Sequence, residues 1–326
     1  MKRLSGLLLC LLLFWQQYLI AQPAPIAVHD PVMIKQDSMY YLFCTGRGIS
    51  MWSSKDMINW NREKQVFDTL IWAAKAVKGF RNHIWAPDIS YHNGLYYLYY
   101  SVSAFGKNTS CIGVATNKTL HPGSPDYKWI DHGKLIQSVP GRDMWNAIDP
   151  NLIIGEKQEP WLVFGSFWNG IKLVKLNNDL VSVAQPEQWF TVASRPRNSI
   201  FPDSVAGDAA IEAPFIIKKN DQYYLFVSFD YCCRGEKSTY KMVVGRSDKV
   251  EGPYKDQEGV PMNMGGGSTL LEGDKNWHGV GHNAVISVDG TDWLVFHAYD
   301  AADKGRSKLR IEKITWIEGW PAVKRN

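Results

Sequence analysis

Acidic residues recur beside proline in this chain at intervals of about sixty residues. Three aspartates and one glutamate occupy short apolar segments that resemble one another, and a histidine stands in a fifth such segment: Asp30, Asp88, Asp149, Glu212 and His282. The steps between them are 58, 61, 63 and 70 residues. A single aspartate before a turn often just bonds nearby backbone amides. A cluster of carboxylates is costly to stability, because repulsion raises some of their pKa values, so the set indicates a functional site.

Carboxyl groups in this number suit the hydrolysis of a glycosidic bond. That reaction needs two of them beside the scissile bond, one as acid and one as base or nucleophile. A third carboxylate nearby keeps the acid protonated near neutral pH by like-charge repulsion. The chemistry therefore depends on a fold that brings distant segments of the chain together.

A repeated strand pattern predicts that fold. A polar turn and a short apolar-aromatic strand follow each acidic segment, at Tyr40–Phe43, Tyr96–Tyr99, Trp161–Phe164, Tyr223–Phe226 and Trp293–Phe296. Equivalent aromatic positions lie 56, 64, 63 and 69 residues apart. Each copy is typical of a β-hairpin. Five copies, with little room for long helices, predict an all-β, single-domain, five-bladed β-propeller. A β-sandwich is the alternative, but it does not require so regular a repeat.

The propeller prediction places the acidic segments at one site. The first strand of each blade runs beside the central channel, and equivalent positions in successive blades converge at one mouth of it. The acidic segments are the natural candidates for these first strands. We therefore expect Asp30, Asp88, Asp149, Glu212 and His282 to approach one another from five directions.

The start of the chain predicts export. Met1-Lys2-Arg3 is basic, an apolar run follows from Leu7 to Leu13, and Ala21 is a small residue at a plausible cleavage point. This pattern is typical of a signal peptide over residues 1–21, which leaves a catalytic domain over 22–326 in a secreted or periplasmic protein. The run is shorter than the roughly 20 residues of a membrane span, so we expect no membrane attachment after cleavage.

The composition of the chain indicates which classes of binding partner to expect. The formal net charge is +4, and the basic residues are spread along the chain without a Lys/Arg run, so no nucleic-acid partner is indicated. Nothing requires a protein partner, and we expect a monomer. The adjacent Cys232 and Cys233 form either a local disulfide or two free thiols, and the sequence leaves this open.

Several motifs in order resemble the glycoside hydrolase family 43 endo-arabinanases, from about residue 27 to the C-terminus. They are His29–Val32, His83–Asp88, Trp145–Asn151, Gly165–Gly170, Ile211–Phe215, Cys232–Gly235 with Ser238–Tyr240, and Gly281–Asn283. The resemblance implies an inverting enzyme that cleaves internal α-1,5-L-arabinofuranosidic bonds of arabinan. It further implies that Asp30 is the general base, that Glu212 is the general acid, and that Asp149 orients Glu212 and raises its pKa. Asp88 receives no catalytic role.

The resemblance also implies a hydrated calcium ion in the central channel, contacted by His282. Calcium prefers oxygen ligands, so this expectation depends on the resemblance alone. We expect His297, in the next strand, to be a core residue. Trp85, Phe105, Trp168 and Asn169 are candidates for the sugar cleft, with Asn146 and Ser166 as partners for hydroxyl groups. Packing within a blade is the alternative for each aromatic residue.

Two other functions stay open at this point. The first is an exo-acting arabinofuranosidase or β-xylosidase of the same family, because the sequence does not reveal which loops close the channel mouth. The second is a carbohydrate-binding propeller without catalysis. Such a protein would not need Asp30, Asp149 and Glu212 together.

Overall fold

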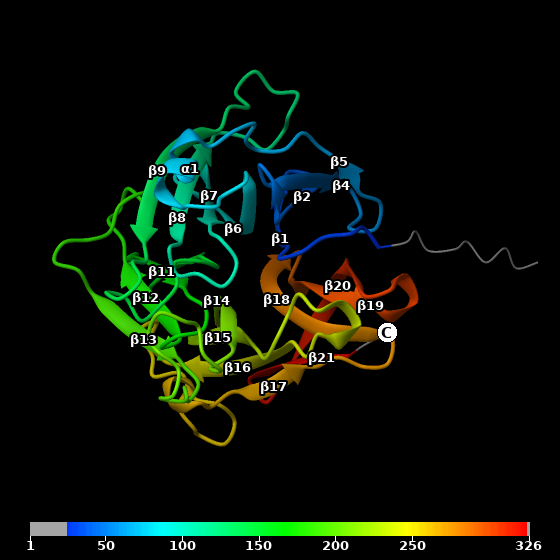
Figure 1. Cartoon of the computed structure of the whole chain (residues 1–326). Helices are drawn as coiled ribbons and strands as arrows, with labels where there is room; N and C mark the ends of the chain where they lie inside the picture. Colours follow the sequence, from blue (N-terminus) through cyan, green and yellow to red (C-terminus); the bar gives the residue numbers. More distant parts are fainter. Residues whose placement is uncertain (1–24, 325–326) are drawn as a thin grey trace, which may run out of the picture.

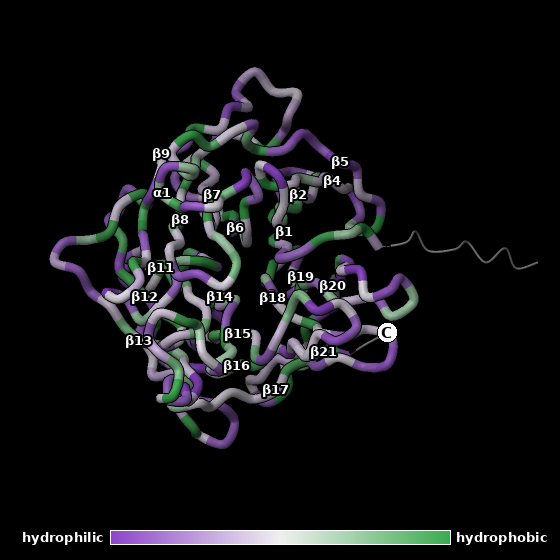
Figure 2. Tube along the Cα trace, viewed as in Figure 1, coloured by the Kyte–Doolittle hydropathy of each residue, from purple (hydrophilic) through white to green (hydrophobic). Residues whose placement is uncertain are grey.

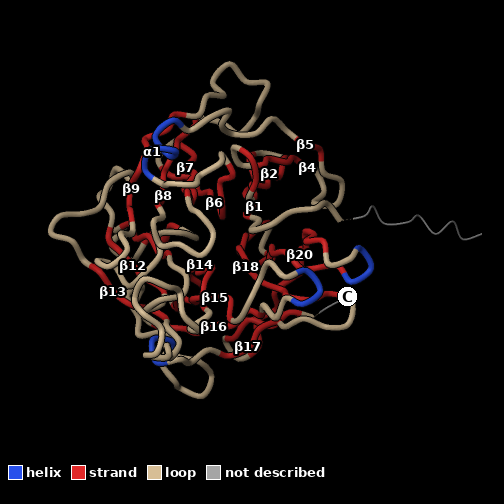
Figure 3. The backbone as a smooth tube through the Cα atoms, viewed as in Figure 1, coloured by secondary structure: helices blue, strands red, loops and turns tan. Residues whose placement is uncertain are grey.

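The computed structural model describes residues 25–324, which form five antiparallel sheets around a common centre (Figure 1). The predicted five-bladed β-propeller is confirmed. The helices within the described residues are short, while strands surround the centre on every side (Figure 3). Within residues 25–324 we find no helix with the length and apolar character that a membrane span requires. The predicted signal peptide lies outside the described residues.

Each blade is a sheet of four strands that follow one another along the chain, and the second blade gains a short fifth strand from the connection between the second and third strands of the first blade. Blade 1 contains β1 (Val32–Gln36), β2 (Met39–Cys44), β4 (Ser50–Ser54) and β5 (Asn61–Arg62). Blade 2 contains β3 (Gly46–Arg47), β6 (His83–His92), β7 (Leu95–Val102), β8 (Cys111–Asn117) and β9 (Ile130–Gln137). Blade 3 contains β10 (Asn151–Ile154), β11 (Pro160–Phe164), β12 (Ile171–Lys175) and β13 (Trp189–Ala193).

Blades 4 and 5 follow the same plan. Blade 4 contains β14 (Ile211–Lys219), β15 (Gln222–Phe229), β16 (Lys241–Ser247) and β17 (Ser268–Leu271). Blade 5 contains β18 (Trp277–Val288), β19 (Thr291–Asp300), β20 (Arg306–Ile317) and β21 (Trp320–Val323). The helical turns are α1 (Ile71–Ala76), η1 (Gly235–Lys237), η2 (Met262–Met264) and η3 (Ala301–Asp303).

The predicted hairpin is formed by β1–β2, β6–β7, β10–β11, β14–β15 and β18–β19, and we call β1, β6, β10, β14 and β18 the first strands of their blades. The repeated aromatic residue lies in the second strand and pairs with the first, as Ile34 with Tyr41, Ser90 with Tyr97, Ile153 with Trp161, Ile217 with Tyr224 and Ile286 with Trp293. The first strands contact one another around the centre (Figure 1). The acidic segments at their starts are thereby brought to one place.

Apolar side chains fill the spaces between the blades, and hydrophilic residues predominate in the rim loops (Figure 2). The ring closes where blade 1 meets blade 5. There Met33 and Leu42 pack in one cluster with Val295 and Leu309, and the Leu309 amide donates a hydrogen bond to the Ile26 carbonyl at 2.9 Å. Burying a side chain of this size contributes about 1.5–3 kcal/mol, so this contact is a substantial part of ring closure.

Candidate active site

One residue with left-handed backbone marks the inner end of each blade. These residues are Asp30, Ala86, Asp149, Ala213 and His282, with φ angles of 52°, 41°, 59°, 55° and 52°. In blades 2, 4 and 5 the pairing of the first two strands shifts register around this residue. Non-glycine residues rarely adopt this conformation, so its recurrence at five equivalent positions indicates a functional constraint.

This geometry corrects the equivalence inferred from the acidic residues. Glu212 lies one position before the left-handed residue of its blade, and Asp88 lies two positions after that of its own blade. The Asp88 carboxylate is buried and accepts hydrogen bonds from Asn151 Nδ2 at 3.2 Å and from the Leu152 amide at 2.9 Å. It braces blade 2 against blade 3, and the expectation that it converges with the other acidic residues is wrong.

Side chains of the preceding blade hold most of the left-handed residues in place. The backbone amides of Asp30, Ala86, Asp149 and His282 donate, respectively, to His297 Nδ1 at 3.1 Å, Thr45 Oγ1 at 2.8 Å, Ser101 Oγ at 2.9 Å and Ser228 Oγ at 2.9 Å. His297 is thus buried, as predicted, but its ring nitrogen also caps the Asp30 backbone. Each acceptor comes four residues after the repeated aromatic residue.

Blade 3 breaks this pattern, because its acceptor position is Gly165. Gly165 has a φ of 132°, and a Cβ atom there would lie 2.9 Å from the Gly170 carbonyl oxygen, so only glycine is readily accommodated. Without a side chain at this position, the Ala213 amide donates instead to Asp149 Oδ2 at 3.1 Å. A missing side chain thus lets blade 4 orient the Asp149 carboxylate.

A cavity of about 440 Å³ opens where these residues meet. Its lining includes the predicted residues Asp30, Asp149, Glu212, His282, Trp85 and Phe105. His29, Thr45, His83 and the disulfide-bonded pair Cys232–Cys233 complete much of the wall. Phe105 is 82% exposed, so its ring is free to contact a ligand at the rim. The size of the cavity suits a small organic ligand or part of a polymer.

Four of the predicted cleft residues do not line this cavity. Ser166 lies behind it and donates to Glu212 Oε2 at 2.9 Å. Trp168 is 2% exposed, and its indole nitrogen donates to the Asp203 carbonyl at 2.9 Å. A ring so covered has no free face for a sugar, so the expectation that Trp168 lies in the sugar cleft is wrong. Asn146 is buried, Asn169 lies on the exposed turn beside Lys172, and neither reaches the lining.

Asp30 is surrounded by hydrogen-bond donors. Its Oδ1 lies 2.7 Å from His29 Nδ1 and 3.0 Å from His282 Nδ1, and Thr45 Oγ1 donates to its Oδ2 at 2.5 Å. Burial opposes ionisation, yet the imidazoles of His282 and His29 hold the pKa of Asp30 well below its usual value. Asp30 is therefore an ionised carboxylate at the cavity wall.

Asp149 and Glu212 have the opposite character. Burial raises the pKa of both carboxyl groups, and repulsion from Glu212 raises the pKa of Asp149 further. Tyr240 donates to Glu212 Oε1 at 2.8 Å and, with Ser166, limits the rise at Glu212. The pair keeps a proton near neutral pH. One ionised carboxylate facing a pair that holds a proton is the arrangement that acid–base catalysis requires.

The residues around His282 do not form a calcium site by themselves. Burial lowers the pKa of His282, but the charges of Asp30 and Asp149 outweigh it and raise this pKa to about 9. His282 belongs to neither group of three closely spaced potential ligands found in residues 25–324, which are His29 with Cys232 and Cys233, and His29 with Asp30 and His297. Calcium takes six to eight oxygen ligands, whereas these groups offer mainly nitrogen and sulfur.

Several supporting residues were missed in the sequence. Thr45, Ser101 and Ser228 were detectable, because each lies at the same distance after the repeated aromatic residue as His297 does. Tyr240 and Tyr299 had no such signal. Tyr240 reaches Glu212 from the β15–β16 connection of the same blade, and Tyr299 in β19 of blade 5 reaches His29 beside blade 1. Such contacts depend on the fold rather than on local spacing.

A propeller whose inner strand ends hold an ionised carboxylate beside a proton-holding carboxyl pair has the parts of a glycoside hydrolase. The comparison with known families agrees. The chain belongs to glycosyl hydrolases family 43, whose model matches residues 23–321.

Individual relatives cover almost the whole chain. An extracellular exo-α-(1→5)-L-arabinofuranosidase of Cellvibrio japonicus is 54% identical, over 91% of this chain and 86% of the relative. An extracellular endo-α-(1→5)-L-arabinanase of Bacillus subtilis is 43% identical, over 90% and 87%. The solved structure of a Cellvibrio cellulosa α-L-arabinanase complexed with arabinohexaose superimposes with a TM-score of 0.91 at 53% identity, covering 92% of this chain and 96% of that one.

Proposed function

We propose that the protein hydrolyses α-1,5-L-arabinofuranosidic bonds of arabinan with inversion at the anomeric carbon. The observation that carries the proposal is the joint placement of ionised Asp30 and the proton-holding pair Asp149–Glu212 in one cavity. The two relatives named above, at 54% and 43% identity, both carry names that specify an α-(1→5) linkage and L-arabinose units.

Each carboxyl group has a role in a single displacement. Glu212 donates its proton to the glycosidic oxygen as the bond to the leaving sugar breaks. Asp30 accepts a proton from the water that attacks the anomeric carbon from the opposite face. Asp149, oriented by the Ala213 amide, and Glu212 repel each other when both are ionised, so the pair retains one proton that Glu212 can donate. At the end of one turnover Asp30 holds the proton and Glu212 is ionised, and exchange with solvent restores both.

The mode of cutting is the finer question. Internal cleavage, as predicted from the sequence, has support in the endo-acting relative at 43% identity. Release of sugars from a chain end has more support, because the exo-acting relative is 54% identical. We therefore favour the exo-acting alternative. Export and a monomeric state stay predictions, as does a calcium ion beside His282 with water molecules as its other ligands.

The test is incubation of the purified protein with linear debranched arabinan, with sizing of products over time. Arabinose or one short oligosaccharide from the outset supports chain-end action, whereas mixed oligosaccharides with a rapid fall in viscosity support internal cleavage. NMR of the first product checks inversion. Absence of arabinan hydrolysis, with xylan and arabinoxylan also tested, would overturn the substrate assignment.

Substitutions test the roles of the carboxyl groups. Glu212→Gln and Asp30→Asn are each expected to lower kcat by about 10²- to 10⁴-fold, the usual contribution of a positioned acid or base. Glu258→Gln, an exposed change outside the cavity, serves as the control and should leave kcat unchanged. An unchanged kcat in Glu212→Gln would mean that another residue is the general acid. An unchanged kcat in both variants would mean that the active site lies elsewhere in the molecule.

A further inference from the structure

A chain of hydrogen bonds connects the cavity-wall disulfide to Asp30. The backbone amide of Cys233 donates to the Tyr299 hydroxyl at 2.7 Å, and that hydroxyl lies 2.8 Å from His29 Nε2. The other ring nitrogen, His29 Nδ1, lies 2.7 Å from Asp30 Oδ1. Tyr299 and His29 thus form a bridge of two side chains between the Cys232–Cys233 loop and the carboxylate.

The direction of the protons in this chain follows from the donors. Asp30 is ionised and can only accept, so the hydrogen of its contact with His29 lies on Nδ1. The Tyr299 oxygen accepts the Cys233 N–H, and its hydroxyl can donate its one hydrogen to His29 Nε2. A ring nitrogen that accepts at Nε2 carries its hydrogen at Nδ1, which then donates to Asp30. The arrangement therefore selects one tautomer of His29, the one that stabilises the Asp30 carboxylate.

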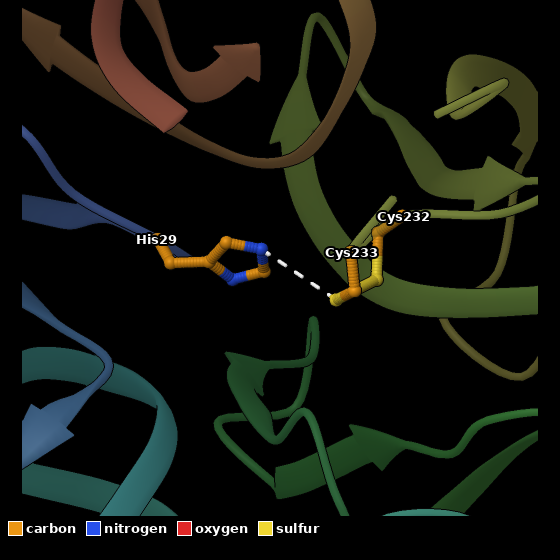
Figure 4. Close-up of side chains that lie close together, drawn as sticks. All are labelled: His29, Cys232 and Cys233. Atoms are coloured by element: carbon orange, nitrogen blue, oxygen red, sulfur yellow. Dashed lines mark hydrogen bonds between the residues drawn. A yellow bond between two sulfur atoms is a disulfide. The ribbon is translucent and has the colours of Figure 1, made fainter. Parts of the chain in front are cut away.

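The His29 ring has little freedom to leave this position. Its face stacks on the His297 ring with centroids 3.9 Å apart. Its Nε2 edge faces the disulfide, with Cys233 Sγ at 3.7 Å (Figure 4). The disulfide joins two successive residues and so restricts the loop that supplies the Cys233 amide. Opening it releases that amide and removes one wall against which the ring lies.

We propose that Tyr299 and the Cys232–Cys233 disulfide are positioning residues for Asp30, acting through the tautomer and orientation of His29. The inference deepens the proposed function and rests on it, because it gives Asp30 the role of base. It also makes turnover sensitive to the redox state of the pair. Reduction breaks the sulfur–sulfur bond and leaves two thiols in the wall. An added dithiol supplies the two electrons and two protons and becomes a disulfide, whereas an added phosphine supplies the electrons, takes oxygen from water as the phosphine oxide, and leaves the two protons of that water for the thiols.

The first measurement needs no substrate. Protein labelled with ¹⁵N-histidine is examined by NMR, with the His29→Gln variant identifying the His29 signals. We expect the Nδ1–H tautomer in the wild type and a mixture of tautomers in Tyr299→Phe, in C232S/C233S and in reduced wild type. Tyr99→Phe removes an equally buried hydroxyl, bonded to the Leu180 carbonyl, and should change nothing. An Nε2–H wild type, or unchanged signals in the variants, would overturn the proposal.

The second measurement separates positioning from binding. Tyr299→Phe and C232S/C233S should lower kcat on arabinan by about 10- to 100-fold, as small misplacements of catalytic groups do, with KM changed by less than about threefold. Reductant should bring the wild type to the level of C232S/C233S and leave that variant unaffected. A change in KM alone would overturn the positioning role. If the wild type fails to cleave arabinan, the proposed function fails, while the NMR result still decides whether the chain orients His29.

Discussion

Individual residues at this site owe their protonation to their immediate neighbours rather than to their type. Asp30 and Asp149 are both buried aspartates at equivalent positions of two blades, yet their pKa values move in opposite directions. Asp30 receives three side-chain donors, two of them imidazoles. Asp149 receives the Ala213 amide and faces the Glu212 carboxyl group. The two aspartates occupy equivalent positions in the fold. The side chains that contact them make Asp30 the base and Asp149 the partner of the acid.

The Asp149–Glu212 pair makes a pH-dependent prediction. In Asp149→Asn the repulsion on Glu212 is lost, so the pKa of Glu212 falls and this acid loses its proton at a lower pH. The alkaline limb of the pH profile for kcat should therefore shift to lower pH by about one unit or more, with a lower maximum. Steady-state kinetics across the pH range measure this. An alkaline limb that stays in place or moves upward would argue against repulsion as the cause.

Two aromatic rings line the cavity, whereas a third that was also expected there is buried outside it. Trp85→Ala and Phe105→Ala are expected to raise KM on arabinan by about 2- to 10-fold, matching an aromatic contact of roughly 0.5–1.5 kcal/mol. Trp168→Phe should leave KM unaltered, because its ring lies outside the cavity lining and is covered. Initial-rate kinetics on linear arabinan check all three. A raised KM in Trp168→Phe would restore its predicted role in binding.

At the scale of elements, a polar ladder ties neighbouring first strands together. Asp88 in β6 accepts from Asn151 and from the Leu152 amide of β10, and Asn151 Oδ1 in turn accepts the Ile216 amide of β14 at 2.8 Å. Blades 2, 3 and 4 are thereby joined. Acidic residues in similar sequence segments therefore have different roles. Asp30 and Asp149 face the cavity, whereas Asp88 bonds to the neighbouring blade.

The ladder predicts a loss of stability without direct loss of chemistry. Asp88→Ala leaves the Leu152 amide and the Asn151 side chain without their acceptor, and should lower the free energy of unfolding by about 1–3 kcal/mol. Urea unfolding followed by circular dichroism measures it. Lys64→Ala, at an exposed surface pair with Asp68, is the matched surface control and should cost less than about 1 kcal/mol. Equal losses in the two variants would contradict a bracing role.

The strands were more predictable from sequence than the side-chain directions within them. The aromatic repeat located every hairpin, since strand alternation and polar turns are local signals. The acidic residues were aligned by chemical type, and this placed Asp88 two positions and Glu212 one position away from their true equivalents. The left-handed residue that sets the alignment is sometimes alanine, as at Ala86 and Ala213, so type alone could not reveal it. The Tyr299–His29 contact needs the closed ring, and the Tyr240–Glu212 contact needs the folded fourth blade.

At the scale of the whole molecule, the site depends on ring closure. Asp30 belongs to the first blade and His282 to the last, and these blades meet through the cluster containing Leu42, Val295 and Leu309 (Figure 1). The cavity is therefore complete only when the first and last blades are joined. Loosening this one seam should disturb the base and its histidine partners before it disturbs Glu212.

The seam makes a stability prediction. Leu42 is fully buried, and Leu42→Ala should lower the free energy of unfolding by about 2–5 kcal/mol, the usual effect of such a cavity. Denaturant titration with tryptophan fluorescence and circular dichroism should give coincident transitions. Ile317→Ala, at an exposed position of β20, is the control and should have little effect. Two separate transitions in Leu42→Ala would mean that the blades unfold independently of closure.

Gly165 has a consequence for reading the sequences of other propellers of this kind. The Ala213 amide donates to Asp149 because Gly165, which stands where the other blades carry the side chain that accepts from such an amide, has no side chain. A descendant with serine at this position would offer that amide its own hydroxyl and leave the aspartate free to turn away. Such a protein would retain all three carboxylic acids and still lose the tuning of its acid. A search for the three acidic residues alone would class such a protein as an active enzyme. Glycine at the position of Gly165 is the better indicator of activity.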